Sequence, residues 1–89
     1  TPKAEQRDLC VETWTSYVQS VEVTWGSPYG DPEELDRAAR EVAGWDVDLV
    51  VLDCMGYTSA MKERVRQLSG KPVVLSRTIA ARVVMELLA

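Results

Sequence analysis

The stretch "DLVVLDCMGYTSAM", residues 48–61, decides the predicted fold. Residues 49–52 are apolar without any alternation, which is typical of a strand buried on both faces of a parallel sheet. Asp53–Tyr57 then supply a turn, and Thr58 is a suitable N-cap for a helix that follows. The residues of this helix that we expect to face inward are Met61, Val65 and Leu68, and Gly70 is a typical stop.

Two further stretches are predicted strands. Residues 72–75, "PVVL", are apolar, and Pro72 stands at the first position of the strand, where its missing N–H does least harm. Residues 21–25, "VEVTW", alternate apolar and polar side chains with period two, as a half-buried strand does. We therefore expect three strands.

The second predicted helix has the clearest start. Asp31 is a good N-cap, Pro32 suits the first helical position, and Glu34 completes an arrangement similar to a capping box. Gly44 is a plausible stop. The expected buried stripe of this helix consists of Leu35, Ala38, Ala39 and Val42.

Helices are also predicted at both ends of the chain. Residues 4–18 have helical spacing of their apolar side chains, which are Cys10, Trp14, Tyr17 and Val18. The last helix is predicted to be capped by Ser76 or Thr78. Its inward residues are expected to be Ile79, Val83 and Leu87.

The order of the elements, a helix followed by three strand–helix units, favours an α/β fold. We expect a three-layer αβα sandwich with a short parallel sheet, Rossmann-like or flavodoxin-like, in a single domain over residues 1–89. An opening helix with no strand before it suggests that the chain begins just after one. We therefore expect it to be part of a longer protein.

Composition excludes several classes of function. The net charge is -4 and basic residues do not cluster, so we expect no nucleic-acid partner. No apolar run is long enough for a membrane span, and no signal-peptide pattern is present. Histidine is absent, which excludes histidine-dependent triads and makes a zinc site implausible. The two cysteines have neither metal-site nor disulfide spacing, so we expect a cytoplasmic protein without metal or cofactor.

Three segments are expected at the carboxyl edge of the sheet, where ligands bind in this class of fold. They are residues 26–30, 53–58 and 76–78. Backbone amides at helix N-termini favour anions, so a small anionic metabolite is the expected ligand. Arg77 would suit a carboxylate, and the alternative is that it is only solvated. Tyr29 and Tyr57 would either close over a ligand or pack at the sheet edge.

Cys54 is the candidate reactive residue, because it lies between a central strand and a helix N-terminus, where thiols ionise more readily. The alternative is that Cys54 is a small apolar core residue. Asp53 is expected to anchor the loop through backbone amides, and the alternative is that it contacts a substrate. Cys10 is expected to fill the buried stripe of its helix, away from any strand-end loop.

The segments "SPYGDPEEL", "DLVVLDCMGYT" and "GKPVVLSRTIAARVVMELL" resemble the C-terminal half of AroM family proteins. This family resembles the aspartate/glutamate/hydantoin racemase superfamily. That resemblance implies two similar α/β lobes, each of which supplies one cysteine that exchanges a proton at the substrate α-carbon. Cys54 matches the second-lobe cysteine, and Gly56 matches a glycine of the hydantoin type. Asp53 and Met55 depart from the superfamily motif.

The resemblance implies a racemase-like site in the intact protein, with Cys54 as acid/base and no cofactor. Its substrate would be a small carboxylate or a cyclic amide. The groups expected to bind it are the amides of Met55, Gly56 and Tyr57, the hydroxyls of Ser27, Thr58 and Thr78, Tyr29, and the charge of Arg77. The chain alone would hold half of the site and need the N-terminal lobe; a homodimer is also conceivable. The alternatives are a non-catalytic anion-binding module and a structural domain without activity of its own.

Overall fold

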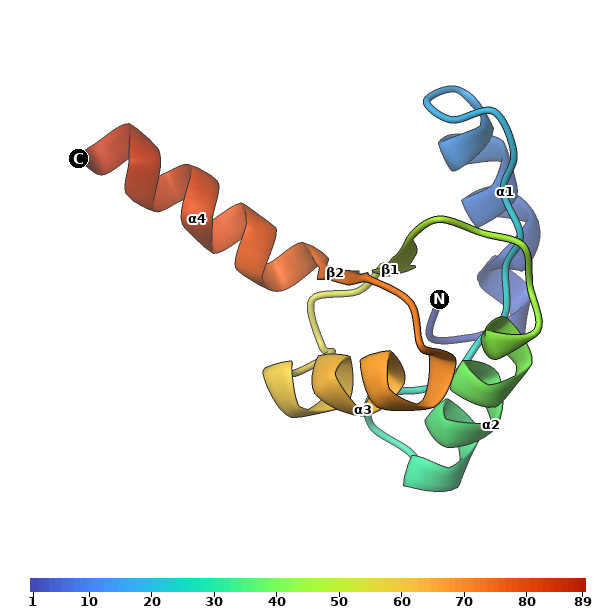
Figure 1. Ribbon diagram of the computed structural model, residues 1–89. Coiled ribbons are helices and arrows are strands. Elements are labelled where there is room, and N and C mark those ends of the chain that lie inside the picture. The colour runs from blue at the N-terminus through green and yellow to red at the C-terminus, as the bar shows by residue number, and fades with distance from the viewer.

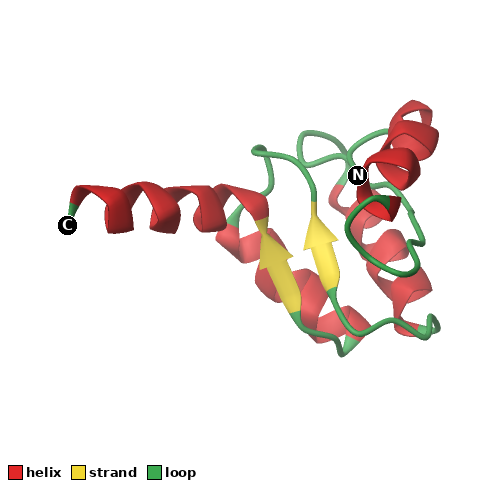
Figure 2. Cartoon of the chain, turned by 90° about the horizontal axis from the view of Figure 1, so that it is seen from above, coloured by secondary structure: helices red, strands yellow, loops and turns green.

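The computed structural model describes residues 1–89 and has a mixed α/β fold with a two-stranded parallel sheet. Its elements, in chain order, are the 3-10 helix η1 (Ala4–Gln6), α1 (Arg7–Thr15), α2 (Pro32–Ala43), β1 (Val50–Leu52), α3 (Ser59–Ser69), β2 (Val73–Leu75) and α4 (Ser76–Leu88). Figures 1 and 2 show α2 and α3 together on one face of the sheet, while α4 projects away from the rest of the molecule. None of these helices has the length and apolar character needed to cross a membrane.

The sheet consists of β1 and β2, which are parallel with Val50 opposite Val73 and Leu52 opposite Leu75. The helix α3 connects the two strands, as a parallel pair requires. The backbone N–H of Val50 also donates to the carbonyl of Pro72, at 2.9 Å. The two strands predicted from apolar runs are therefore confirmed, and Pro72 lies just before β2.

The core lies between this sheet and the helices on its one covered face. It is a cluster of buried side chains from both strands, from α2, from α3 and from the turn after β1: Leu35, Ala39, Leu52, Tyr57, Val65, Val73 and Leu75. All four residues of the predicted stripe of α2 are buried. In α3, Val65 is buried and Met61 and Leu68 pack partly buried against the core, so the predicted inward face is confirmed.

The ends of α2 and α3 follow local sequence chemistry. Asp31 Oδ1 accepts the backbone N–H of Glu33 at 3.0 Å, and Thr58 Oγ1 accepts that of Met61 at 3.2 Å. Gly70 ends α3 with φ of 69°, in the left-handed region that glycine adopts without strain. The capping-box role predicted for Glu34 was wrong, because Glu34 Oε1 accepts from the backbone N–H of Ser27 at 3.2 Å.

The start of α4 differs from the prediction. The helix begins directly after β2, with Leu75 at the N-cap position and no side-chain cap. Ser76 Oγ donates to the carbonyl of Leu52 at 3.0 Å, and Thr78 Oγ1 donates to that of Leu75 at 3.0 Å. Neither hydroxyl caps the helix, because each is used to tie α4 to a strand end.

The outer surface of α4 is apolar and exposed. The inward face predicted for this helix was wrong: Ile79, Val83 and Leu87 are 50%, 55% and 80% exposed, and no residue of α4 is buried. The physical reason is that only the first residues of α4 bond to the body, at the ends of β1 and β2, and the rest of the helix projects away from it. Helical periodicity showed which side chains need a partner, but the chain itself does not supply one.

Residues 21–25 do not form the predicted strand. The α-amino group of Thr1 donates to the carbonyl of Thr24 at 3.1 Å. The backbone N–H of Gly26 donates to the carbonyl of Thr1 at 3.0 Å. The segment therefore has no ladder with β1, and the sheet has two strands instead of three. Alternation predicted which side chains would be half-buried, whereas a strand also requires a hydrogen-bonded neighbour.

The first helical region is shorter than the predicted span of residues 4–18. After the single turn of η1, α1 ends at Thr15, and Tyr17 beyond it is 78% exposed. Cys10 and Trp14 are half-buried, as expected of the inner side of this helix. Both reach the carboxyl end of β1, where the candidate site lies.

Candidate functional site

The turn after β1 holds the sulfur of Cys54 against the chain. The backbone N–H of Gly56 donates to Cys54 Sγ at 3.4 Å, and the N–H of Tyr57 points to the carbonyl of Cys54 at 3.4 Å. The thiol is half-buried and packs partly against the core. An amide donor of the turn after β1 therefore faces the sulfur of Cys54.

Tyr57 joins two of the loops predicted to form the site. Its side chain is 1% exposed, and its hydroxyl donates to the carbonyl of Gly26 at 2.6 Å. Burial raises the pKa of Tyr57 well above its ordinary value of 10.0. Tyr57 therefore fastens the turn after β1 to the loop that begins at Gly26, and its hydroxyl is occupied within the protein.

Asp53 is bonded to side chains of α1, whereas the sequence predicted bonds to backbone amides. Its Oδ2 atom accepts from Trp14 Nε1 at 3.0 Å and from Cys10 Sγ at 3.9 Å. Burial, and then the negative charge of Asp53, raise the pKa of Cys10 above 9.0. The carboxylate is thus held by two side chains of α1.

Cys10 is nearer to the site than the sequence predicted. It was expected to lie away from any strand-end loop, but α1 packs its sulfur against Asp53. Cys10 and Cys54 both line one cavity of about 240 Å³, together with residues of the first helical region. Both thiols are free. The reason is tertiary, since 43 residues separate Cys10 from Asp53 in the chain.

The loop that begins at Gly26 lies over the turn of Cys54. Ser27 Oγ accepts from the backbone N–H of Tyr29 at 3.1 Å, which closes a tight local turn. Tyr29 is 81% exposed, and a Cβ at Gly56 would come within 2.6 Å of its ring carbon Cζ. Met55 is 62% exposed. Tyr29 and Gly56 are therefore adjacent, as a shared site at this edge requires.

The other predicted binding residues have structural roles or face solvent. The hydroxyl of Thr58 caps α3, and that of Thr78 bonds to a strand-end carbonyl. Arg77 is exposed and forms no salt bridge. None of Ser27, Tyr29, Thr58, Arg77 and Thr78 lines the cavity of the two cysteines.

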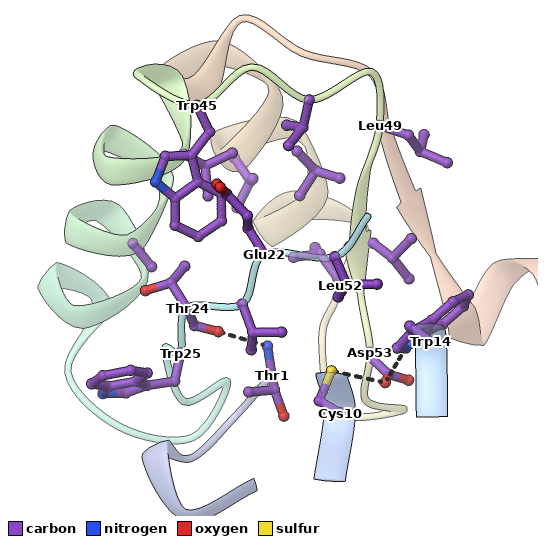
Figure 3. Close-up of a pocket in the computed structure, with 18 of the residues that line it drawn as sticks. Thr1, Cys10, Trp14, Glu22, Thr24, Trp25, Trp45, Leu49, Leu52 and Asp53 are labelled. Carbon is purple, nitrogen blue, oxygen red and sulfur yellow. Dashed lines mark hydrogen bonds between the residues drawn. The ribbon is translucent and has the colours of Figure 1, made fainter. Parts of the chain in front are cut away.

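A second and larger cavity, which we call the β1-edge cavity, has a volume of about 320 Å³. It lies where the third strand was predicted, between residues 20–26 and the unpaired edge of β1, with the buried stripe of α2 as its floor (Figure 3). An empty, closed cavity of this size would cost about 8 kcal/mol. That is comparable to the whole stability expected of such a chain, about 4–13 kcal/mol. The space is therefore open to water or filled.

The residues that sequence reasoning missed lie around this cavity. The three tryptophans Trp14, Trp25 and Trp45 line it. One signal in the sequence could have indicated this cavity. It is the alternation of apolar and polar side chains in residues 21–25, which form one wall of the cavity. No cluster of three or more cysteine, aspartate or glutamate side chains is arranged to hold a metal ion.

Comparison with known proteins identifies the family. The family model described as AroM protein matches residues 1–88. The chain belongs to the AroM protein family. No curated protein and no solved structure matched it. The resemblance predicted from the segments around Cys54 is thus confirmed at the level of the family, and the AroM match includes both cysteines.

Proposed function

We propose that this AroM chain is the C-terminal lobe of a racemase-like protein and that Cys54 is one of its two acid/base groups. The observation that carries the proposal is the backbone N–H of Gly56 aimed at Cys54 Sγ, at 3.4 Å. A thiolate at this position would be held by a fixed dipole at the carboxyl end of a parallel strand, where α/β folds bind ligands. The resemblance to the aspartate/glutamate/hydantoin racemase superfamily implies the same role for this residue.

The chemistry assigned to Cys54 is proton transfer at an acidic carbon. The thiolate removes a proton from the substrate Cα, so that an S–H bond forms and the C–H electron pair delocalises into the neighbouring carbonyl. An acid from the other lobe then protonates the opposite face. The substrate class is a small carboxylate or a cyclic amide, for which Arg77 supplies an unpaired positive charge.

The exposed surface supports a further lobe in the intact protein. The chain exposes 6199 Å², whereas a folded monomer of 9.9 kDa is expected to expose roughly 5,200 Å². The excess, roughly 1,000 Å², is about what one partner buries in a standard interface. We propose that the N-terminal lobe covers α4 and completes a three-layer αβα sandwich; a homodimer is the alternative. The isolated chain is then inactive.

The test is alkylation of Cys54 by iodoacetamide in a Cys10→Ser background, in folded and denatured protein across a range of pH. We expect the folded thiol to react faster than the denatured thiol near neutral pH, because the backbone N–H of Gly56 is aimed at its sulfur only in the folded chain. The converse variant, Cys54→Ser, reports Cys10, which we expect to react slowly. A Cys54 that stays protected until the protein unfolds would refute the acid/base role.

A second function, non-catalytic binding of a small anion, is favoured by one observation. The hydroxyls of Tyr57, Thr58 and Thr78 are already used within the protein, which leaves fewer groups to stabilise a reacting substrate. The two functions differ in deuterium exchange at the substrate α-carbon. Deuterium exchange that the intact AroM protein catalyses and that Cys54→Ser abolishes supports proton transfer. Binding of the anion without deuterium exchange supports the non-catalytic function.

A further inference from the structure

The β1-edge cavity differs in charge from the anion site expected at the strand ends. We propose that it binds a small hydrophobic amine in its protonated form. This inference goes beyond the acid/base role of Cys54, which does not line the cavity. It stands on the shape, the apolar lining and the sign of the charges around the opening.

The apolar part of the cavity is large enough for an aromatic ring and a short chain. Its floor is the stripe of α2, one wall is β1, and Val21 and Val23 line the opposite side. A volume of about 320 Å³ falls in the range of ligand pockets, and an apolar cavity of about half that volume binds benzene. Residues 21–25 do not pair with β1, so nothing in the chain fills this space.

The charged side chains that line the cavity have one sign, although the guanidinium of Arg37 lies outside it on the Trp25 ring. The charged side chains that line it are Glu22, Asp46, Asp48 and Asp53, and no lysine or arginine lines it. The α-amino group of Thr1 also lies there, but it donates to the carbonyl of Thr24 at 3.1 Å, and burial lowers its pKa. A carboxylate ligand would meet only repulsion from these side chains, whereas an ammonium group would be attracted.

The acceptor for the ammonium group lies at the end of the cavity near Trp45. Glu22 and Trp45 both line the cavity, and in the view of Figure 3 they are drawn away from Asp53 and Trp14. Asp53 is already bonded to Trp14, whereas Glu22, Asp46 and Asp48 form no salt bridge. A cation between a carboxylate and an indole face gains both an ion pair and a cation–π contact. We therefore assign the ammonium group to this end.

The experiment compares two probes of nearly equal size and opposite charge, 4-phenylbutylamine and 4-phenylbutyrate. Each is titrated into the chain at low salt, and binding is followed by amide chemical shifts of residues 21–25 and 45–52. We expect the amine to bind at least about tenfold more tightly than the acid and the preference to fall with added salt. Equal binding of the two probes, or tighter binding of the acid, would overturn the proposal.

A set of matched variants tests the assigned end. Glu22→Gln with Asp46→Asn and Asp48→Asn should reduce the preference for the amine to about twofold or less. The control removes three carboxylates outside the cavity, with Glu5→Gln, Asp8→Asn and Glu12→Gln, and should keep the full preference.

If neither probe binds, and hydrogen exchange shows residues 21–25 protected by pairing with β1, the cavity is closed in solution and the proposal is wrong. Absence of binding without that protection also contradicts it, because the open cavity would then not take the amine. Since neither readout uses Cys54 chemistry, failure here leaves the proposed acid/base function untouched.

Discussion

Replacing Tyr57 with phenylalanine tests the contact that joins the two loops at the strand ends. The tyrosine is 1% exposed, and its hydroxyl donates to the carbonyl of Gly26 at 2.6 Å. The substitution removes one oxygen and keeps the ring, so the packing of the core is retained. What is lost is the hydrogen bond, and the Gly26 carbonyl is left without its donor.

The expected cost follows from this geometry. A buried acceptor that loses its partner destabilises a protein by about 1–3 kcal/mol. For a chain of this size, each kcal/mol lowers Tm by about 4–8 °C. We therefore expect Tyr57→Phe to lower Tm by about 4–24 °C, because both the cost and its conversion into Tm span a range. The loss is a large part of a total stability of about 4–13 kcal/mol.

The assay is urea and thermal unfolding of Tyr57→Phe and of a matched control, Tyr29→Phe. Tyr29 is 81% exposed, so loss of its hydroxyl should change the stability by less than about 0.5 kcal/mol. Equal stability of Tyr57→Phe and the wild type would refute the reasoning, because the hydroxyl would then have no energetic role in joining the loops.

The same residue predicts a pH dependence. Burial raises the pKa of Tyr57 above its ordinary value of 10.0, so the unfolded chain ionises this phenol first and ionisation favours unfolding. The stability that this group contributes is complete below pH 10 and is lost as the pH rises toward the folded-state pKa. Tyr57→Phe should therefore lose less stability than the wild type above pH 10, measured by urea unfolding.

Two further predictions concern the contacts that hold α2 in place. Gly26→Ala should destabilise the chain by about 1–3 kcal/mol, because a Cβ there would come within 2.9 Å of the Leu35 Cα; Gly30→Ala, whose nearest neighbour is at 3.6 Å, should cost less in urea unfolding. Asp36 accepts two bonds from Arg64, each of 3.0 Å, which lower the pKa of its carboxyl below 3.8. Stability from this pair is complete above about pH 4–5 and lost as the pH falls through the folded-state pKa, so Asp36→Asn should lower Tm near neutral pH and flatten the acid side of the Tm profile. A Tm profile unchanged by Asp36→Asn would contradict this assignment.

The strand–turn–helix unit around Cys54 could be predicted because each of its parts depends on neighbouring residues. The apolar run became β1, Thr58 capped α3, and Gly70 ended it in the left-handed region. The position of Cys54 at the carboxyl end of a parallel strand followed from the same pattern. Such features need no knowledge of distant parts of the chain.

The surroundings of the candidate site could not be predicted in the same way. The bond from Cys10 to Asp53 joins residues far apart in sequence, and helical spacing indicated only that Cys10 faces inward. Tyr57 was expected either to close over a ligand or to pack, and only the position of Gly26 showed that its hydroxyl is bonded within the protein.

By itself the sequence determined the two apolar strands, the capped helices α2 and α3 and their buried faces, because hydrophobic spacing and cap residues act over a few positions. Only the tertiary structure decided what lies against each face. It placed Thr1 against the backbone on either side of Trp25 and left residues 21–25 without a bond to β1, and it left every residue of α4 unburied. Pairing and covering depend on where distant segments meet, and local patterns do not contain that information.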